Sequence, residues 1–211
     1  MKKALIVWGG WEGHEPEPVA KILAAALGDN GFEVEVADTL EAFEDEDKLK
    51  GLDLIVPEWT MGEISGAQLN PVLAAVESGV GIAGLHGGMG DAFRQSTQWQ
   101  FMVGGQWVAH PGGGDVTYGV EIVSDDPIVA GIKDFEVTSE QYYMHVDPNI
   151  EVLAITYFPE FGEAAVPVVW KKSWGEGRVF YSSLGHNAEV AAQAEPLEIM
   201  TRGMLWAAKA L

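Results

Sequence analysis

Cysteine is absent from this chain of 211 residues. Its absence excludes a disulfide framework, a thiolate metal site and a cysteine nucleophile. Long apolar runs are also missing, because the apolar start at residues 4–8 breaks at Gly9-Gly10. A secretory segment needs a longer run, and a membrane-spanning helix needs about 20 apolar residues. We therefore expect a cytoplasmic, soluble protein that does not enter a membrane.

Basic residues are scarce. The chain has 12 lysines and arginines against 32 aspartates and glutamates, a formal net charge of -20. Such a surface repels phosphate backbones and anionic membranes, so we predict no nucleic-acid partner and no membrane partner. The acidic run at residues 41–47 is interpreted as a solvated surface segment. Neither composition nor charge determines whether the chain forms a homo-oligomer.

Strand and helix patterns alternate through the first half of the chain. Hydrophobic residues make up 47% of the sequence, which is enough for a sizeable core. The alternation predicts an α/β fold with three layers: a mostly parallel sheet with helices on both faces. Expected strands are residues 3–7, 32–36, 52–56 (halted by Pro57) and 80–84; expected helices are residues 18–27 and 70–78, with Pro71 in the first turn.

The second half is less regular. Residues 100–114, rich in glycine and tryptophan, predict a structured loop or lid. No repeat and no Pro/Ser-rich linker interrupts the chain, so we expect one domain over residues 1–211. Further strands are expected at residues 116–123, 151–156, 166–170 and 177–182, followed by a closing helix at residues 189–211.

Three loops are expected at one edge of the sheet. Right-handed crossovers bring the carboxyl ends of parallel strands together, and ligands usually bind there. The loops at residues 9–14, 57–62 and 86–91 all follow predicted strands.

The segment Gly84-Leu85-His86-Gly87-Gly88 has the form of a nucleophile elbow. In such a turn the central side chain is held at the top of the sheet, and flanking glycines avoid collisions with neighbouring elements. The amides of the following helix disfavour protonation, so we expect a neutral His86 imidazole. A neutral imidazole can act as a base, a hydrogen-bond donor or a metal ligand, or it can simply pack within the loop.

Other polar side chains share the predicted edge. His14 follows the first strand, and His186 follows the strand that ends near Ser183. Glu140 precedes an aromatic turn, where a carboxylate can orient an imidazole, transfer a proton or complete a metal shell. His110 and His145 fit either substrate contact or a structural role.

Tryptophan is abundant, with eight residues. Trp11, Trp59 and Trp107 fall in predicted loops, where aromatic faces beside polar groups suit the apolar face of a sugar ring. Core packing accounts for most of the remaining tryptophans.

Motifs along nearly the whole chain resemble the ThuA-like (trehalose utilisation) family, within the class I glutamine amidotransferase-like fold group. The matching pieces are Gly9-Gly10 with His14, the Gly84–Gly88 turn with Asp91 and Phe93, Gly104-Gly105 with His110, Glu140-Gln141-Tyr142, and the stretch from Gly177 to His186. The resemblance implies a flavodoxin-like sheet and a role in carbohydrate metabolism, with trehalose or related disaccharides as the associated substrates.

One departure limits what the fold group implies. Its amidotransferases carry a cysteine at the elbow, where this chain has His86, while His186 corresponds to their later histidine. Glutamine hydrolysis through a thioester is therefore excluded.

The sequence thus predicts a sugar-processing enzyme, of hydrolase or isomerase type, acting on a disaccharide, glycoside or keto-sugar. The predicted catalytic residues are His86, His186 and Glu140; the predicted substrate-binding residues are Trp11, His14, Trp59, Asp91, Trp107, His110, Tyr142 and His145. Alternatively, His86, Glu140 and His186, with or without His14, hold a divalent metal such as zinc. A non-catalytic sugar-binding or regulatory module is the competing class, and an oligomerisation scaffold is a third.

Overall fold

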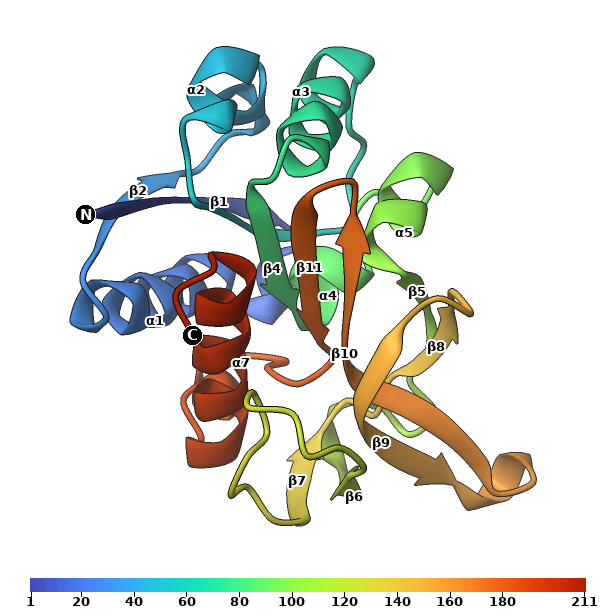
Figure 1. Ribbon diagram of the computed structural model, residues 1–211. Helices are drawn as coiled ribbons and strands as arrows, with labels where there is room; N and C mark the ends of the chain where they lie inside the picture. Colours follow the sequence, from blue (N-terminus) through green and yellow to red (C-terminus); the bar gives the residue numbers. More distant parts are fainter.

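The computed structural model describes residues 1–211 and contains a nine-stranded mixed sheet (Figure 1). The strand order is β2-β1-β3-β4-β11-β10-β9-β6-β7. A separate pair, β5 and β8, lies beside it. The strands are β1 (Lys2–Gly10), β2 (Phe32–Ala37), β3 (Leu54–Thr60), β4 (Gly81–Leu85), β5 (Gly105–Ala109), β6 (Val116–Ile122), β7 (Phe135–Ser139), β8 (Tyr143–Val146), β9 (Glu151–Phe158), β10 (Ala164–Trp174) and β11 (Gly177–Ser182).

The first five strands of this order are parallel, as the α/β prediction requires. β1 pairs with β2 and β3, and β4 pairs with β3 and β11. Residues 4–7 of β1 are all buried, which explains their unbroken apolar run: helices cover both faces of the strand. This half has the flavodoxin-like arrangement that the sequence predicts.

The other four strands are antiparallel, which the sequence pattern did not predict. β10 returns along β11, and β9, β6 and β7 continue the sheet outward. The link between β6 and β9 is short, because only Glu121 and Ile122 pair with β9. The parallel half therefore carries an antiparallel extension.

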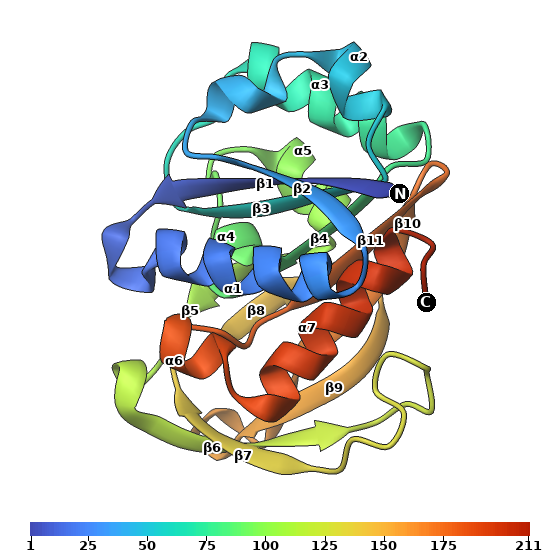
Figure 2. The same ribbon diagram turned by 90° about the vertical axis from the view of Figure 1, so that its left-hand side faces the viewer.

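Helices cover both faces of the parallel half (Figure 2). One apolar core lies beneath α1 and α7, and a second lies beneath α2, α3 and α5. The helices are α1 (Pro16–Asp29), α2 (Glu46–Lys50), α3 (Gly66–Glu77), α4 (His86–Gly90), α5 (Thr97–Val103), α6 (Ala188–Ala191) and α7 (Ala194–Ala207), with short 3-10 turns η1 (Glu12–His14), η2 (Leu40–Phe43), η3 (Gly113–Asp115) and η4 (Pro159–Phe161).

Two prolines do not act as the sequence pattern predicts. β3 continues through Pro57 to Thr60. Its pairing with β4 ends at Ile55, so beyond that residue β3 is hydrogen-bonded only to β1. A proline, which has no amide N–H, is tolerated in a strand that is paired on one side only. α3 begins at Gly66 because Ser65 caps it, so Pro71 lies inside the helix and not in its first turn.

Two segments of the second half also differ from the prediction. Residues 100–114 form the end of α5 and then β5, which pairs with β8, so the segment is not a free lid. The closing helix is divided into α6 and α7. Pro196 accounts for the division, since proline is accepted in a first turn and breaks a helix interior.

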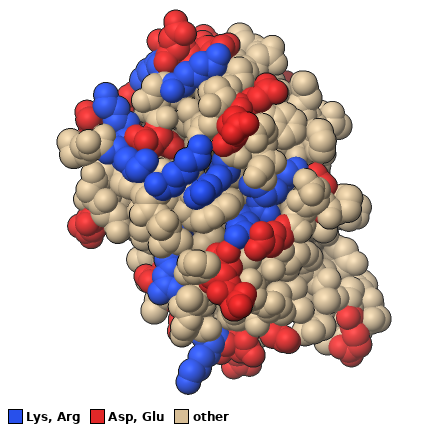
Figure 3. Space-filling view, viewed as in Figure 1, with Lys and Arg blue, Asp and Glu red and all other residues tan.

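None of the helices combines the length and the apolar character that a membrane span requires. On the face drawn in Figure 3, many basic side chains lie beside acidic ones. Among the ion pairs of the molecule are Lys2 with Asp53 and Lys50 with Glu46.

Two helical glycines provide a test of the α7 packing. A Cβ at Gly203 of α7 would lie 2.1 Å from the Phe180 ring of β11, whereas a Cβ at Gly28 of α1 would meet nothing within 4 Å. We expect Gly203→Ala to lower the free energy of unfolding by about 1–3 kcal/mol through overpacking. Gly28→Ala should be neutral or stabilising by up to about 1 kcal/mol, since alanine favours helix. Urea denaturation measures both; equal effects would contradict the tight contact between α7 and β11.

Candidate functional site

Three histidines and one glutamate meet at the carboxyl ends of the parallel strands. His14 ends η1, which follows β1; His86 begins α4, directly after β4; and His186 follows β11. Glu140 comes from the antiparallel extension, between β7 and β8. One nitrogen or oxygen from each of the four lies within 4.8 Å of the others. The structure thus brings together the three predicted catalytic residues and His14, which the sequence places at the same edge.

The carboxylate of Glu140 is the centre of this group, which we call the His–Glu cluster. Its Oε2 lies 3.1 Å from His86 Nε2, 3.3 Å from His186 Nδ1 and 3.4 Å from His14 Nε2. The other oxygen, Oε1, lies 3.8 Å from His110 Nε2. Glu140, His14 and His86 are all buried, at 6%, 3% and 1% exposure. A single buried carboxylate therefore faces four imidazoles.

His86 occupies a strained turn. Its φ is +42°, in the left-handed region that non-glycine residues seldom adopt. The turn lies between β4 and α4, which is the strand–turn–helix context of a nucleophile elbow. Both glycines after it are packed tightly: a Cβ on Gly87 would lie 2.5 Å from His14 Nδ1, and one on Gly88 would lie 2.4 Å from Glu58 Oε2. The elbow fixes the His86 imidazole against its neighbours.

Hydrogen bonds outside the cluster orient its imidazoles. His86 Nδ1 lies 2.8 Å from the Ser183 carbonyl oxygen, which can only accept, so Nδ1 carries the proton. His14 Nδ1 lies 2.9 Å from the Thr60 hydroxyl. In both rings it is therefore Nε2 that points toward Glu140.

Two tyrosines hold the backbone of the cluster. The Tyr181 hydroxyl donates to the His86 carbonyl oxygen at 2.9 Å. The Tyr118 hydroxyl donates to the Glu140 carbonyl oxygen at 3.3 Å. Each tyrosine comes from a strand of the sheet, so the sheet itself restrains both residues.

Burial determines the charge of His86. Desolvation lowers its pKa to about 4, although Glu140 and the Ser183 carbonyl act in the opposite direction. The imidazole is thus neutral near pH 7, as predicted, but the cause is burial more than the field of a helix. Burial alone would raise the pKa of Glu140; the contacts with His14, His186 and His86 outweigh it and lower that pKa, so the carboxylate is ionised.

Aromatic rings line the cluster. The Tyr142 ring stacks on His86 with centroids 3.9 Å apart, and Trp11, which is 46% exposed, packs edge-on against His14 at 4.8 Å. Trp107 lies 5.4 Å from His110. Four predicted binding residues, Trp11, Trp107, His110 and Tyr142, therefore border the cluster, and a fifth, His14, belongs to it.

Three predicted substrate-binding residues lie apart from the cluster. Trp59 packs over Gly9 and Gly62. His145 is exposed on β8 and lines a pocket with Phe101. Buried Asp91 receives two hydrogen bonds from Arg94, whose guanidinium lies 4.5 Å above the Trp107 ring, so Asp91 supports the aromatic wall indirectly.

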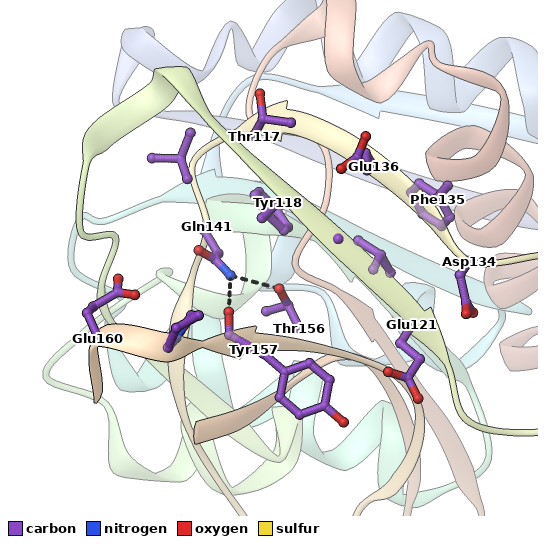
Figure 4. A pocket seen from close by; sticks show the side chains of 14 residues that line it. Thr117, Tyr118, Glu121, Asp134, Phe135, Glu136, Gln141, Thr156, Tyr157 and Glu160 are labelled. Atoms are coloured by element: carbon purple, nitrogen blue, oxygen red, sulfur yellow. Dashed lines mark hydrogen bonds between the residues drawn. The ribbon is translucent and has the colours of Figure 1, made fainter. Parts of the chain in front are cut away.

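A groove of about 830 Å³ lies elsewhere, between β6, β7 and β9. The Gln141 amide points into it and donates to Thr156 Oγ1 and to the Tyr157 carbonyl oxygen (Figure 4). None of the predicted site residues lines this groove. Glu140 therefore belongs to the His–Glu cluster, whereas the adjacent Gln141 lines this groove.

Several residues that orient the cluster were missed from the sequence. Thr60 and Ser183 lie in segments that we associated with the binding edge, but their pattern gives no sign of a contact with a histidine. Tyr118 and Tyr181 lie within expected strands, where nothing distinguishes them from ordinary strand residues. Glu58 is 2% exposed, and burial raises its pKa well above the usual value. The sequence did not predict that Glu58 lies within β3, because we expected Pro57 to end that strand.

A family model described as trehalose utilisation, ThuA, matches residues 3–207. The chain belongs to the ThuA family. No curated protein matches its sequence. Family membership supports a role related to trehalose utilisation and confirms the resemblance found in the motifs.

Comparison with solved structures supports the α/β fold described above. A ThuA-like protein from Parabacteroides merdae is 18% identical, with a TM-score of 0.77, over 98% of this chain and 90% of that chain. A cytoplasmic protein from Salmonella typhimurium is 12% identical, with a TM-score of 0.65, over 99% and 96%. A β-galactosidase from Bacillus circulans is 12% identical, with a TM-score of 0.64, but only 30% of its length is covered. At these identities the likeness concerns the fold alone.

The buried, neutral His86 makes stability depend on pH. An unfolded histidine takes up a proton near pH 6.5, whereas folded His86 resists protonation until about pH 4. The contribution of His86 to the free energy of unfolding is complete above pH 6.5 and is lost as the pH falls toward 4. Over this range the free energy of unfolding falls by up to about 1.4 kcal/mol per pH unit. As the pH falls from 6.5 to 5, we expect the free energy of unfolding of the His86→Asn variant to decrease less steeply than that of the unsubstituted protein. Urea denaturation at several pH values tests this, and parallel slopes would contradict a neutral His86.

Proposed function

We propose that this ThuA-family protein is a carbohydrate-processing enzyme whose reaction takes place at the His–Glu cluster. One observation carries the proposal: a buried, ionised Glu140 is surrounded by imidazoles at the carboxyl edge of the parallel strands. Burial of so many titratable groups around one carboxylate is costly for stability and typical of functional sites. Ligands of open α/β sheets bind at this edge.

The side chains suit the hydroxyl and carbonyl chemistry of sugars. Glu140 is an ionised acceptor, and neutral His86 offers an unprotonated nitrogen toward it. His186 and His110 are less buried, with side-chain exposures of 17% and 36%, so they connect the cluster with solvent. We assign the reaction to His86, Glu140 and His186, which can exchange protons with a substrate or bind it through a metal.

The aromatic border favours a saccharide as the substrate class. Flat rings beside polar groups bind the apolar faces of sugars, and Trp11, Trp107 and Tyr142 border the cluster beside histidines. The family description, trehalose utilisation, agrees with this class. We therefore propose a disaccharide, a glycoside or an oxidised keto-sugar as the substrate, and the cytoplasm as the place of action.

Replacement of Glu140 tests the proposal. Purified protein would be incubated with trehalose, other disaccharides, aryl glycosides and their keto derivatives, and the products identified by NMR. For any substrate turned over, Glu140→Gln should lower kcat/KM by at least about a hundredfold, because the amide keeps the shape and removes the charge. Glu33→Gln, the same change on the exposed face of edge strand β2, should retain full activity.

Two results would overturn this assignment. Full activity in Glu140→Gln would remove the cluster from the reaction. Saturable binding of a saccharide with no product from any compound of the panel would instead identify a non-catalytic sugar-binding module. Circular dichroism of Glu140→Gln would verify that the variant remains folded.

A further inference from the structure

We infer that His14, His86, Glu140 and His186 together form a binding site for one divalent transition-metal ion. The spacing of their atoms is the first argument. At metal–ligand distances of about 2.0–2.1 Å, neighbouring ligands of a tetrahedral site lie about 3.3–3.4 Å apart. The three nitrogens lie 3.1, 3.3 and 3.4 Å from Glu140 Oε2.

Hydrogen bonding alone does not account for this arrangement. His86 Nδ1 donates a hydrogen bond to the Ser183 carbonyl, so a ring with a single proton presents the lone pair of Nε2 to an oxygen that also carries lone pairs. His186 Nδ1 is buried and has no hydrogen-bond partner, although it lies 3.3 Å from the same oxygen. A cation between these atoms converts each of these unfavourable contacts into a bond.

The surroundings match those of a metal centre. Metal-ligating histidines usually donate their second ring nitrogen to a carbonyl, carboxylate or hydroxyl oxygen, which fixes the ring. His86 has the Ser183 carbonyl and His14 has the Thr60 hydroxyl in that position. A Cβ on Gly87 would collide with both His14 and Thr60, so the backbone of the elbow also packs closely against these two residues.

The donor set also selects the class of ion. Three imidazole nitrogens and one carboxylate oxygen suit zinc and related first-row ions, whereas calcium and magnesium prefer oxygen ligands. The four ligand atoms lie within 4.8 Å of one another. Two ligands at about 2.0–2.1 Å from one ion lie at most about 4.2 Å apart, so the most distant pair would move closer together when the ion binds.

This inference deepens the proposed function and rests on it for its meaning. A bound ion would polarise a sugar hydroxyl or carbonyl, or lower the pKa of a water molecule. His110 lies 3.8 Å from the other oxygen of Glu140 and is not one of the four ligands.

Metal binding tests the inference without any substrate. Protein purified without chelators should contain about one equivalent of a transition metal by elemental analysis. After removal of the metal, isothermal titration calorimetry with zinc chloride should show one site per chain. Glu140→Gln and His14→Gln should each weaken zinc binding at least tenfold, since each removes one ligand. Calcium chloride should give no comparable heat.

Two further variants separate ligation from general effects. Thr60→Val is nearly isosteric and removes only the hydroxyl beside His14 Nδ1, so we expect zinc affinity to fall by about 10–100-fold. His145→Gln removes an exposed histidine outside the cluster and should leave zinc affinity unchanged. Thermal unfolding of each metal-free variant verifies its folding.

The outcomes are distinct. No metal in the purified protein and no zinc binding, or equal zinc binding by the unsubstituted protein and Glu140→Gln, would overturn the metal site. Turnover of a sugar by protein that neither contains metal nor binds zinc would overturn the metal site and leave the proposed function intact. Zinc binding at these four residues without turnover of any sugar would leave the metal site and overturn the enzyme assignment.

Discussion

The central constraint in this structure is the burial of one negative charge. The Glu140 carboxylate is removed from water, and the nearest groups that can compensate it are imidazoles. A charge in such a place is costly unless it is paired, bonded to hydrogen donors or bound to a metal. Burial keeps His86 neutral, so that imidazole is a poor counter-charge. The requirement for a cation, whether a proton or a metal ion, follows from these two facts together.

The scaffold meets this constraint by placing rigid elements on every side. The elbow at His86 is short and contains glycines because His14, Thr60 and Glu58 occupy the space that side chains would need. The tyrosine hydroxyls on the sheet hold the carbonyls of His86 and Glu140. Functional groups held in this way require little reorganisation when a ligand arrives.

Much of the parallel half could be predicted from the sequence, because apolar runs, glycine stops and helical spacing are local signals. The convergence of His14, His86 and His186 followed from one rule, that parallel strands end at a common edge. Pro57 and Pro71 misled the prediction because tertiary pairing and the Ser65 cap outweighed a local preference. The direction of β10, β9, β6 and β7 had no local signal, and neither did the hydroxyls and carbonyls that orient the histidines. Such contacts depend on register between distant segments.

The division of the sheet into two halves has a consequence for motion. The histidines belong to the parallel half, whereas Glu140 follows β7, the outermost strand of the extension. β6 and β7 are joined to the rest of the sheet through a short ladder at Glu121 and Ile122. Segments with few connecting bonds open locally at lower free energy than a core does. A local opening of this hairpin would withdraw the carboxylate and leave the imidazoles in place, so the charge of the centre is coupled to a hairpin that a short ladder joins to the sheet.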